Sequence, residues 1–108
     1  MIPEKGVTPH PGEMLLEEYL KPMGITQTMF GAHIGMNATN LSALIHGKRN
    51  LSPRTAMKIA QALNMTPEFW MNLQTMHDLT KAREDMRRRR ELPKIKPMPK
   101  VLEAVGAQ

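Results

Sequence analysis

Two short helical patterns separated by a tight turn limit the folds that are open to this chain. The first helix, predicted at 27–34, has Thr26 as a favourable N-cap, and Gly35 suits the left-handed position that ends a helix. Two residues later Asn37 can cap a second helix, predicted at 38–46. Two short helices joined by a turn that contains glycine are typical of a helix-turn-helix.

The residues between the two helices are suited to close packing. Gly31 lacks a side chain and lets the helices approach, although it costs about 1 kcal/mol of helix propensity relative to alanine. Ile34, Leu41 and Leu44 are expected to seal the contact. A packing reason for Gly31 therefore supports the helix-turn-helix at 27–46.

The remaining cap signals predict three more helices. A first helix over 13–20 should stop at Lys21-Pro22 and turn Met14, Leu15, Tyr19 and Met23 inward. Ser52-Pro53 opens a helix that ends at Asn64, and Thr66-Pro67 repeats the device for a helix to about Glu91. The predicted fold is all-α, with five helices that include the helix-turn-helix.

We expect the chain to divide into three parts. An N-terminal extension covers 1–10, the helix-turn-helix domain covers 11–91, and a basic tail that could be flexible covers 92–108. A strand near Ile95 or Val101 is the strongest β candidate, but the sequence determines little in the tail because three prolines, at 93, 97 and 99, disfavour pairing.

Positive charge is concentrated in two places. The formal charge is +5, yet the first 80 residues hold six basic and six acidic side chains, so the last 28 carry the whole excess. Within the neutral part, residues 19–67 contain five basic residues and no acidic one. A basic middle between acidic ends suggests two surfaces with different partners.

Several classes of protein are excluded by composition and spacing. The absence of cysteine rules out disulfides, thiolate zinc sites and a cysteine nucleophile, and is compatible with a reducing cytoplasm. His10, His33, His46 and His77 show no metal-ligand spacing, so we expect no metal, no cofactor and no catalytic residue. No apolar run approaches 18 residues and the first residues lack an apolar core, so neither a membrane span nor a signal peptide is predicted.

The sequence resembles a known family at several points. QTMFGAHIGMNATNLSALIHGKRNLS, from Gln27, is similar to the helix-turn-helix of Xre/Cro-group repressors. HPGE at 10–13, LSPRTAMKIAQALNMTPEFWMNLQ at 51–74 and His77-Asp78-Leu79 resemble the HigA antitoxins. The resemblance covers about residues 8–85 and implies a five-helix Xre/Cro-like (lambda-repressor-like) helix-turn-helix domain. Local departures are Ala38 and Asn40, where relatives often have arginine, and Gly31 in place of alanine; the first of these puts the operator sequence in doubt.

The resemblance implies partners and a function. HigA proteins like this one are five-helix homodimers that bind double-stranded operator DNA, repress their own operon and neutralise HigB, a ribosome-dependent mRNA endonuclease. Phe69, Trp70 and Leu73 form an apolar stripe, for which core packing is the simplest interpretation and dimer packing the one that the resemblance adds.

The predicted DNA contacts surround the second helix of the motif. Its N-terminal end should reach base edges in the major groove, where asparagine can pair with adenine and methyl groups suit thymine. Neighbouring basic and polar side chains should contact phosphates. The candidate residues are Gln27, Asn37, Ala38, Thr39, Asn40, Ser42, Ala43, His46, Lys48, Arg49 and Arg54.

Two further charged groups have more than one interpretation. Glu13, Glu17 and Glu18 are either a solvated helix face or an acidic patch for a basic toxin. Arg87–Arg90 form a four-arginine run that could be a solvated helix end, an auxiliary DNA arm or a clamp on an acidic partner. Four consecutive positions on a helix cannot share one face.

Two alternatives to an antitoxin stay open. The first is a stand-alone Xre-type repressor without a toxin. The second is a small hydrolase or nuclease that uses His33, His46 or His77, against which stands the absence of a Ser-His-Asp set, a carboxylate pair or metal spacing.

Overall fold

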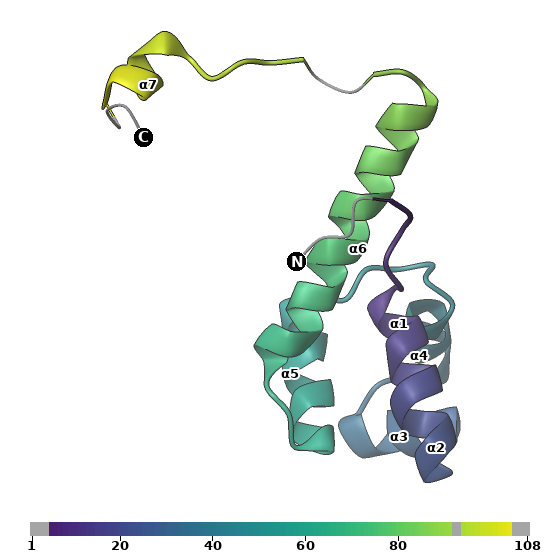
Figure 1. Ribbon diagram of the computed structural model, residues 1–108. Helices are drawn as coiled ribbons and strands as arrows, with labels where there is room; N and C mark the ends of the chain where they lie inside the picture. The colour runs from purple at the N-terminus through teal and green to yellow at the C-terminus, as the bar shows by residue number, and fades with distance from the viewer. Residues whose placement is uncertain (1–4, 92–93, 105–108) are drawn as a thin grey trace.

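A computed structural model describes residues 5–91 and 94–104, which are helical and loop segments without a strand. Pro11–Met14 (α1), the π-helix Leu15–Leu20 (η1) and Lys21–Met23 (α2) form one continuous helical stretch. The other helices are Gln27–Ile34 (α3), Ala38–Ile45 (α4), Pro53–Leu63 (α5), Pro67–Arg88 (α6) and Pro99–Ala104 (α7). Figure 1 shows α1 to α5 gathered around the first half of α6, whose C-terminal part extends past them. The all-α prediction is confirmed.

The predicted helix boundaries of the motif are confirmed by its caps. Thr26 Oγ1 accepts a hydrogen bond from the Met29 N–H (3.1 Å), and Asn37 Oδ1 accepts one from the Asn40 N–H (2.7 Å). Gly35 ends α3 with a φ of 70° and Gly47 follows α4 with a φ of 71°. At both glycines an L side chain would be strained.

The first predicted boundary was wrong, because the chain stays helical through Pro22. In η1 the hydrogen bonds run to the fifth residue back, as from the Lys21 N–H to the Leu16 carbonyl. This wider turn relieves the clash that a proline ring makes with the carbonyl four residues before it. The helix ends instead at Gly24, with φ 68°. The wider turn also changes which side faces inward, and Met23 is 60% exposed rather than buried.

Two expectations for the C-terminal third were also wrong. Helix α6 ends at Arg88 rather than near Glu91, because Arg90 takes a left-handed conformation (φ 57°) and the Glu91 N–H bonds back to the Met86 carbonyl (2.7 Å). Leu92-Pro93, the expected stop, lies outside the described residues. The four arginines are therefore not all helical. Val101 lies in α7, a sixth helix rather than a strand, because the Val101 N–H bonds to the Met98 carbonyl (2.9 Å) directly after Pro99.

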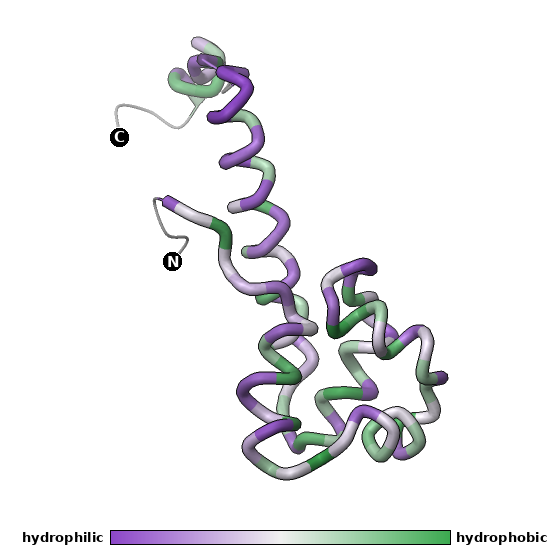
Figure 2. Tube along the Cα trace, turned by 90° about the vertical axis from the view of Figure 1, so that its right-hand side faces the viewer, coloured by the Kyte–Doolittle hydropathy of each residue, from purple (hydrophilic) through white to green (hydrophobic). Residues whose placement is uncertain are grey.

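The core includes the N-terminal half of α6, which packs against α5 and α1. Trp70 is fully buried and its ring centroid lies 5.4 Å from that of Tyr19. Figure 2 shows that most of the hydrophobic residues of the helices lie within the bundle and that the far part of α6 is mostly hydrophilic. The buried apolar residues of the core come from η1, α3, α4, α5 and α6 and from one loop position, Leu51; those in helices are Leu15, Leu20, Phe30, Leu41, Leu44, Ile45, Ala56, Ile59, Ala60 and Trp70.

Candidate nucleic-acid interface

Helices α3 and α4 pack at Gly31, as the sequence predicted. A Cβ atom built on Gly31 would lie 2.9 Å from the Met36 carbonyl oxygen and 3.3 Å from Leu41 Cδ2. The two helices therefore approach more closely than most side chains would allow. Their pairing fixes the direction of α4 relative to the rest of the bundle.

The N-terminal end of α4 is free for contact with a partner. Ala38, Thr39 and Asn40 are all exposed. Asn37 is exposed as well, but its Oδ1 is occupied by the cap to Asn40. The end of a helix also presents unbonded backbone N–H groups, which favour anions such as phosphate. This end of α4 can therefore offer both side chains and backbone donors.

Further along α4, two of the predicted contact residues are tied to each other. His46 Nδ1 lies 2.8 Å from the Ser42 carbonyl oxygen and 3.3 Å from Ser42 Oγ. Because a carbonyl can only accept, Nδ1 carries a proton, and Nε2 of the exposed ring is left for an external partner. Ser42 and Ala43 are half-buried and thus less accessible than His46.

Basic side chains flank α4 on the loop that follows it. We call residues 46–52 the basic loop; its Lys48 and Arg49 are exposed, and so is Arg54 in the first turn of α5. Gln27, the first residue of α3, is half-buried. Most of the polar and basic side chains predicted from the sequence thus lie at the starts of α3 and α4, in the loop after α4 and in the first turn of α5.

Sequence reasoning missed Gln74, which binds the basic loop from α6. Its Oε1 accepts a hydrogen bond from the Leu51 N–H (2.7 Å), and its Nε2 donates to Asn50 Oδ1 (3.4 Å) and Asp78 Oδ1 (2.8 Å). Only 4% of Gln74 is exposed. The available signal was its spacing, four residues after Trp70, which places a polar side chain on the inward face of the helix.

His10 contacts the basic loop from the opposite side. It caps α1 through Nδ1, which accepts from the Gly12 N–H (2.9 Å), and its ring meets that of His77 edge-on at 5.0 Å. Burial lowers the pKa of His10, and repulsion by His77 and Lys81 lowers it further. The Arg49 backbone and the charge of Asp78 act in the opposite direction without reversing the shift. A Cβ atom on Gly47 would lie 3.7 Å from this ring. The neutral imidazole thus packs against the turn that leaves α4.

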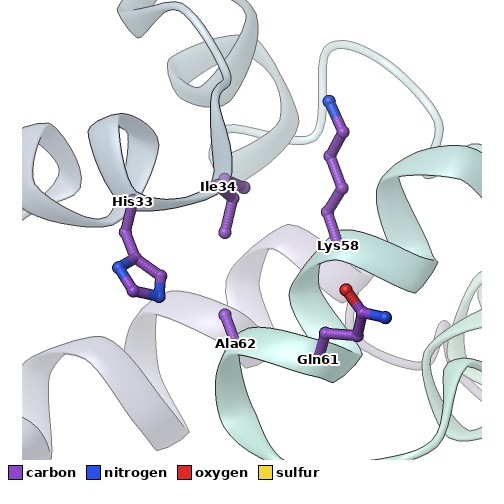
Figure 3. Close-up of a pocket in the computed structure, with 5 residues that line it drawn as sticks. All are labelled: His33, Ile34, Lys58, Gln61 and Ala62. Carbon is purple, nitrogen blue, oxygen red and sulfur yellow. The ribbon is translucent and has the colours of Figure 1, made fainter.

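The other histidines do not assemble a catalytic or metal site. His33 lies in a surface pocket of about 250 Å³ between α3 and α5, which is lined by Ile34, Lys58, Gln61 and Ala62 and by no acidic residue (Figure 3). Across residues 5–91 and 94–104, no three His, Asp or Glu side chains are placed to hold a metal ion. In the same ranges no helix is both long and apolar enough to cross a bilayer.

The acidic residues of the first helical stretch border the start of the basic loop, since Glu13 and Glu17 line a pocket of about 320 Å³ together with His46 and Gly47. Glu13, Glu17 and Glu18 are exposed on α1 and η1, around a pocket of about 230 Å³ that Pro9 and Met14 complete. Glu17 is paired with Lys21 (2.8 Å).

The apolar stripe of α6 divides between core and surface. Trp70 is fully buried, Leu73 is half-buried, and Phe69 is 38% exposed with its ring edge-on to that of Trp70 at 5.4 Å.

Two carboxylates near the end of the helix pair with the arginine run, Glu84 with Arg87 and Asp85 with Arg88, each at 2.8 Å.

A capped helix pair with an exposed second helix and a basic loop defines an Xre-type helix-turn-helix protein. The helix-turn-helix family model matches residues 16–70. The chain is 41% identical over 87 residues to the antitoxin HigA-1 of Vibrio cholerae, covering 81% of this chain and 80% of that protein. It is 34% identical over 85 residues to YbaQ, an uncharacterised helix-turn-helix-type transcriptional regulator of Escherichia coli K12, covering 79% and 75%.

A solved structure gives the same result. The Pseudomonas aeruginosa antitoxin HigA, determined with the higBA promoter, matches with a TM-score of 0.74 and 26% identity over 83% of this chain and 97% of that one. The chain belongs to the HigA family of helix-turn-helix proteins. This is a family of DNA-binding regulators and antitoxins, not of enzymes.

Proposed function

We propose that this chain is the antitoxin of a type II toxin-antitoxin module. In this proposal it is a cytoplasmic homodimer that binds operator DNA, represses its own operon and neutralises a HigB-like mRNA endonuclease. The observation that carries the DNA part is the exposed N-terminal end of α4, together with the basic loop that follows the C-terminal end of the same helix. The toxin part is supported by the likeness to HigA-1 and by the exposed acidic side chains of Glu13, Glu17 and Glu18.

On DNA, α4 would lie in the major groove. Thr39 and Asn40 would reach base edges, with Ala38 against a thymine methyl group. Asn37 and His46 would contact the groove margin, and Ser42 and Ala43 would limit how closely the helix approaches. Phosphates would be held by Gln27, Lys48, Arg49 and Arg54.

A homodimer is proposed because one chain offers few base contacts. Two copies would read half-sites about 34 Å apart, one turn of the double helix. Of the apolar stripe, Trp70 is committed to the core of its own chain. The partly exposed Phe69 and Leu73 are therefore the residues that we assign to packing between copies.

Specificity is expected to depend on the end of α4. Replacing Thr39 and Asn40 together by alanine should lower the ratio of operator to random-sequence affinity by about 10- to 100-fold, the worth of a lost bidentate base contact. Both side chains are exposed and the Asn40 N–H keeps its cap, so the melting temperature should hold. Fluorescence anisotropy with both DNAs measures the ratio, with Thr28→Ala on the exposed face of α3 as control. An unchanged ratio would place base recognition elsewhere.

Toxin neutralisation is tested by growth. Co-expression of this chain with a HigB-like toxin encoded beside its gene should restore the growth that the toxin stops. Replacing Glu13, Glu17 and Glu18 by glutamine should abolish this rescue and leave operator binding intact, whereas Glu68→Gln on α6 should change neither. Rescue by the triple variant would remove the acidic surface from the proposal.

A second candidate function is a regulator without a toxin, and the likeness to YbaQ favours it. The same growth experiment separates the two. Operator binding without any rescue by the parent chain would support the stand-alone regulator.

A further inference from the structure

The orientation of the Gln74 amide is dictated by its three partners. The Leu51 N–H can only donate, so it must meet Oε1. The Asp78 carboxylate can only accept, so it must meet Nε2, and the second N–H of the amide faces Asn50 Oδ1. Both polar atoms of a buried side chain are thus bonded, two of the three contacts being to neighbouring residues of the basic loop.

These contacts hold the loop just beyond its charged residues. On the α4 side the loop is fixed by the bond from the Lys48 N–H to the Ala43 carbonyl (2.8 Å) and by the packing of Gly47 on His10. On the α5 side the Leu51 side chain is buried and Gln74 binds the Leu51 backbone. Lys48 and Arg49 stand between these two anchors with their side chains exposed.

We propose that Gln74 is a positioning residue for DNA binding, holding the basic loop where Lys48 and Arg49 meet the phosphates. This inference rests on the proposed function. A loop that is ordered before binding loses less entropy when it binds, so a preformed loop binds more tightly. Loss of the contact would also leave the Leu51 N–H without its buried partner. Because phosphate contacts carry no sequence information, the effect of Gln74 should be the same for every DNA sequence.

Exchange of the amide for a carboxylate gives a sharp test. In Gln74→Glu one oxygen can keep the Leu51 bond, but the other faces Asp78 and Asn50 Oδ1 without a proton. We expect this variant to bind operator and random DNA about tenfold more weakly, the scale of one buried hydrogen bond, with the ratio between them unchanged. The Leu51 amide proton should exchange faster in the free protein, as followed by NMR.

A second substitution should reverse the loss. When Gln74→Glu is combined with Asp78→Asn, the amide introduced at position 78 can donate to the carboxylate introduced at position 74. The pair is then restored with donor and acceptor exchanged and with the net charge of the parent, so affinity and Leu51 protection should return. Asp78→Asn alone keeps an acceptor for Gln74, and Gln61→Glu adds the same charge at an exposed position on α5; both should bind like the parent. Melting temperatures show that each variant is folded.

The outcomes separate the inference from the function on which it rests. A parent chain that binds no DNA would overturn the proposed function and this inference with it. If the parent binds, equal binding by Gln74→Glu, a loss confined to the operator, or a double variant that stays weak would each overturn the positioning role alone.

Discussion

Replacing Gly12 by alanine is expected to destabilise the fold by at least about 3 kcal/mol, because the added methyl group would meet backbone rather than side chain. A Cβ atom at this position would lie 1.9 Å from the Leu44 carbonyl oxygen, 2.6 Å from its carbon and 2.8 Å from Ile45 Cα. Backbone at the end of a packed helix cannot move aside as a side chain can. Helix α1 would have to leave the surface of α4, which is the helix proposed to read DNA.

Thermal unfolding followed by circular dichroism measures the effect, and the melting temperature should fall by about 12 °C or more. Gly31→Ala is the matched comparison, since its Cβ would meet one carbonyl oxygen at 2.9 Å, a milder approach to backbone, and the movable Leu41 Cδ2 at 3.3 Å. About 1 kcal/mol of helix propensity offsets part of this strain, so Gly31→Ala should destabilise the fold less than Gly12→Ala does. A melting temperature for Gly12→Ala within a few degrees of the parent would contradict the packing of α1 on α4.

The parts of the fold that could be predicted depend on neighbours in the sequence. Thr26, Asn37 and Ser52 each cap a helix through a residue three positions on, and this spacing is visible in the sequence. Thr66 shows the limit of the rule, since it precedes α6 without a side-chain cap. The π-turns of η1 show another limit, because a proline can end a helix or be accommodated by a wider turn, and Lys21-Pro22 alone does not distinguish the two.

The candidate site likewise has one part that local sequence signals predict and another that depends on the fold. Ala38, Thr39 and Asn40 could be located because a capped helix fixes which residues stand at its end. Gln74 could not be assigned its partners, because Leu51 lies 23 positions away and the contact exists only once α6 packs beside the loop. The exposed end of a recognition helix can thus be found from local signals, whereas the residues that hold its loop in place require the fold.

Replacing Lys48 and Arg49 together by alanine should weaken binding to every DNA sequence and flatten its salt dependence. If each side chain neutralises one phosphate, the slope of log affinity against log salt should fall by about two for each protomer. For the proposed dimer, which loses about four phosphate contacts, a fourfold rise in salt should weaken the parent on the order of 100-fold more than the variant. The ratio of operator to random-sequence affinity should hold, in contrast to the Thr39 and Asn40 variant.

The control must separate charge in this loop from charge anywhere on a basic protein. Lys94→Ala with Lys96→Ala removes the same two charges from exposed positions in the tail. Titrations of parent and both variants at several salt concentrations give the three slopes. If the tail variant flattens the slope as much as the loop variant does, the net charge of +5 attracts DNA without a preferred contact, and the phosphate role of the basic loop is wrong. If only the loop variant does so, DNA is attracted by the basic residues within 19–67, where five basic side chains stand without an acidic one. Acidic residues elsewhere in the first 80 positions cancel this local charge in the total.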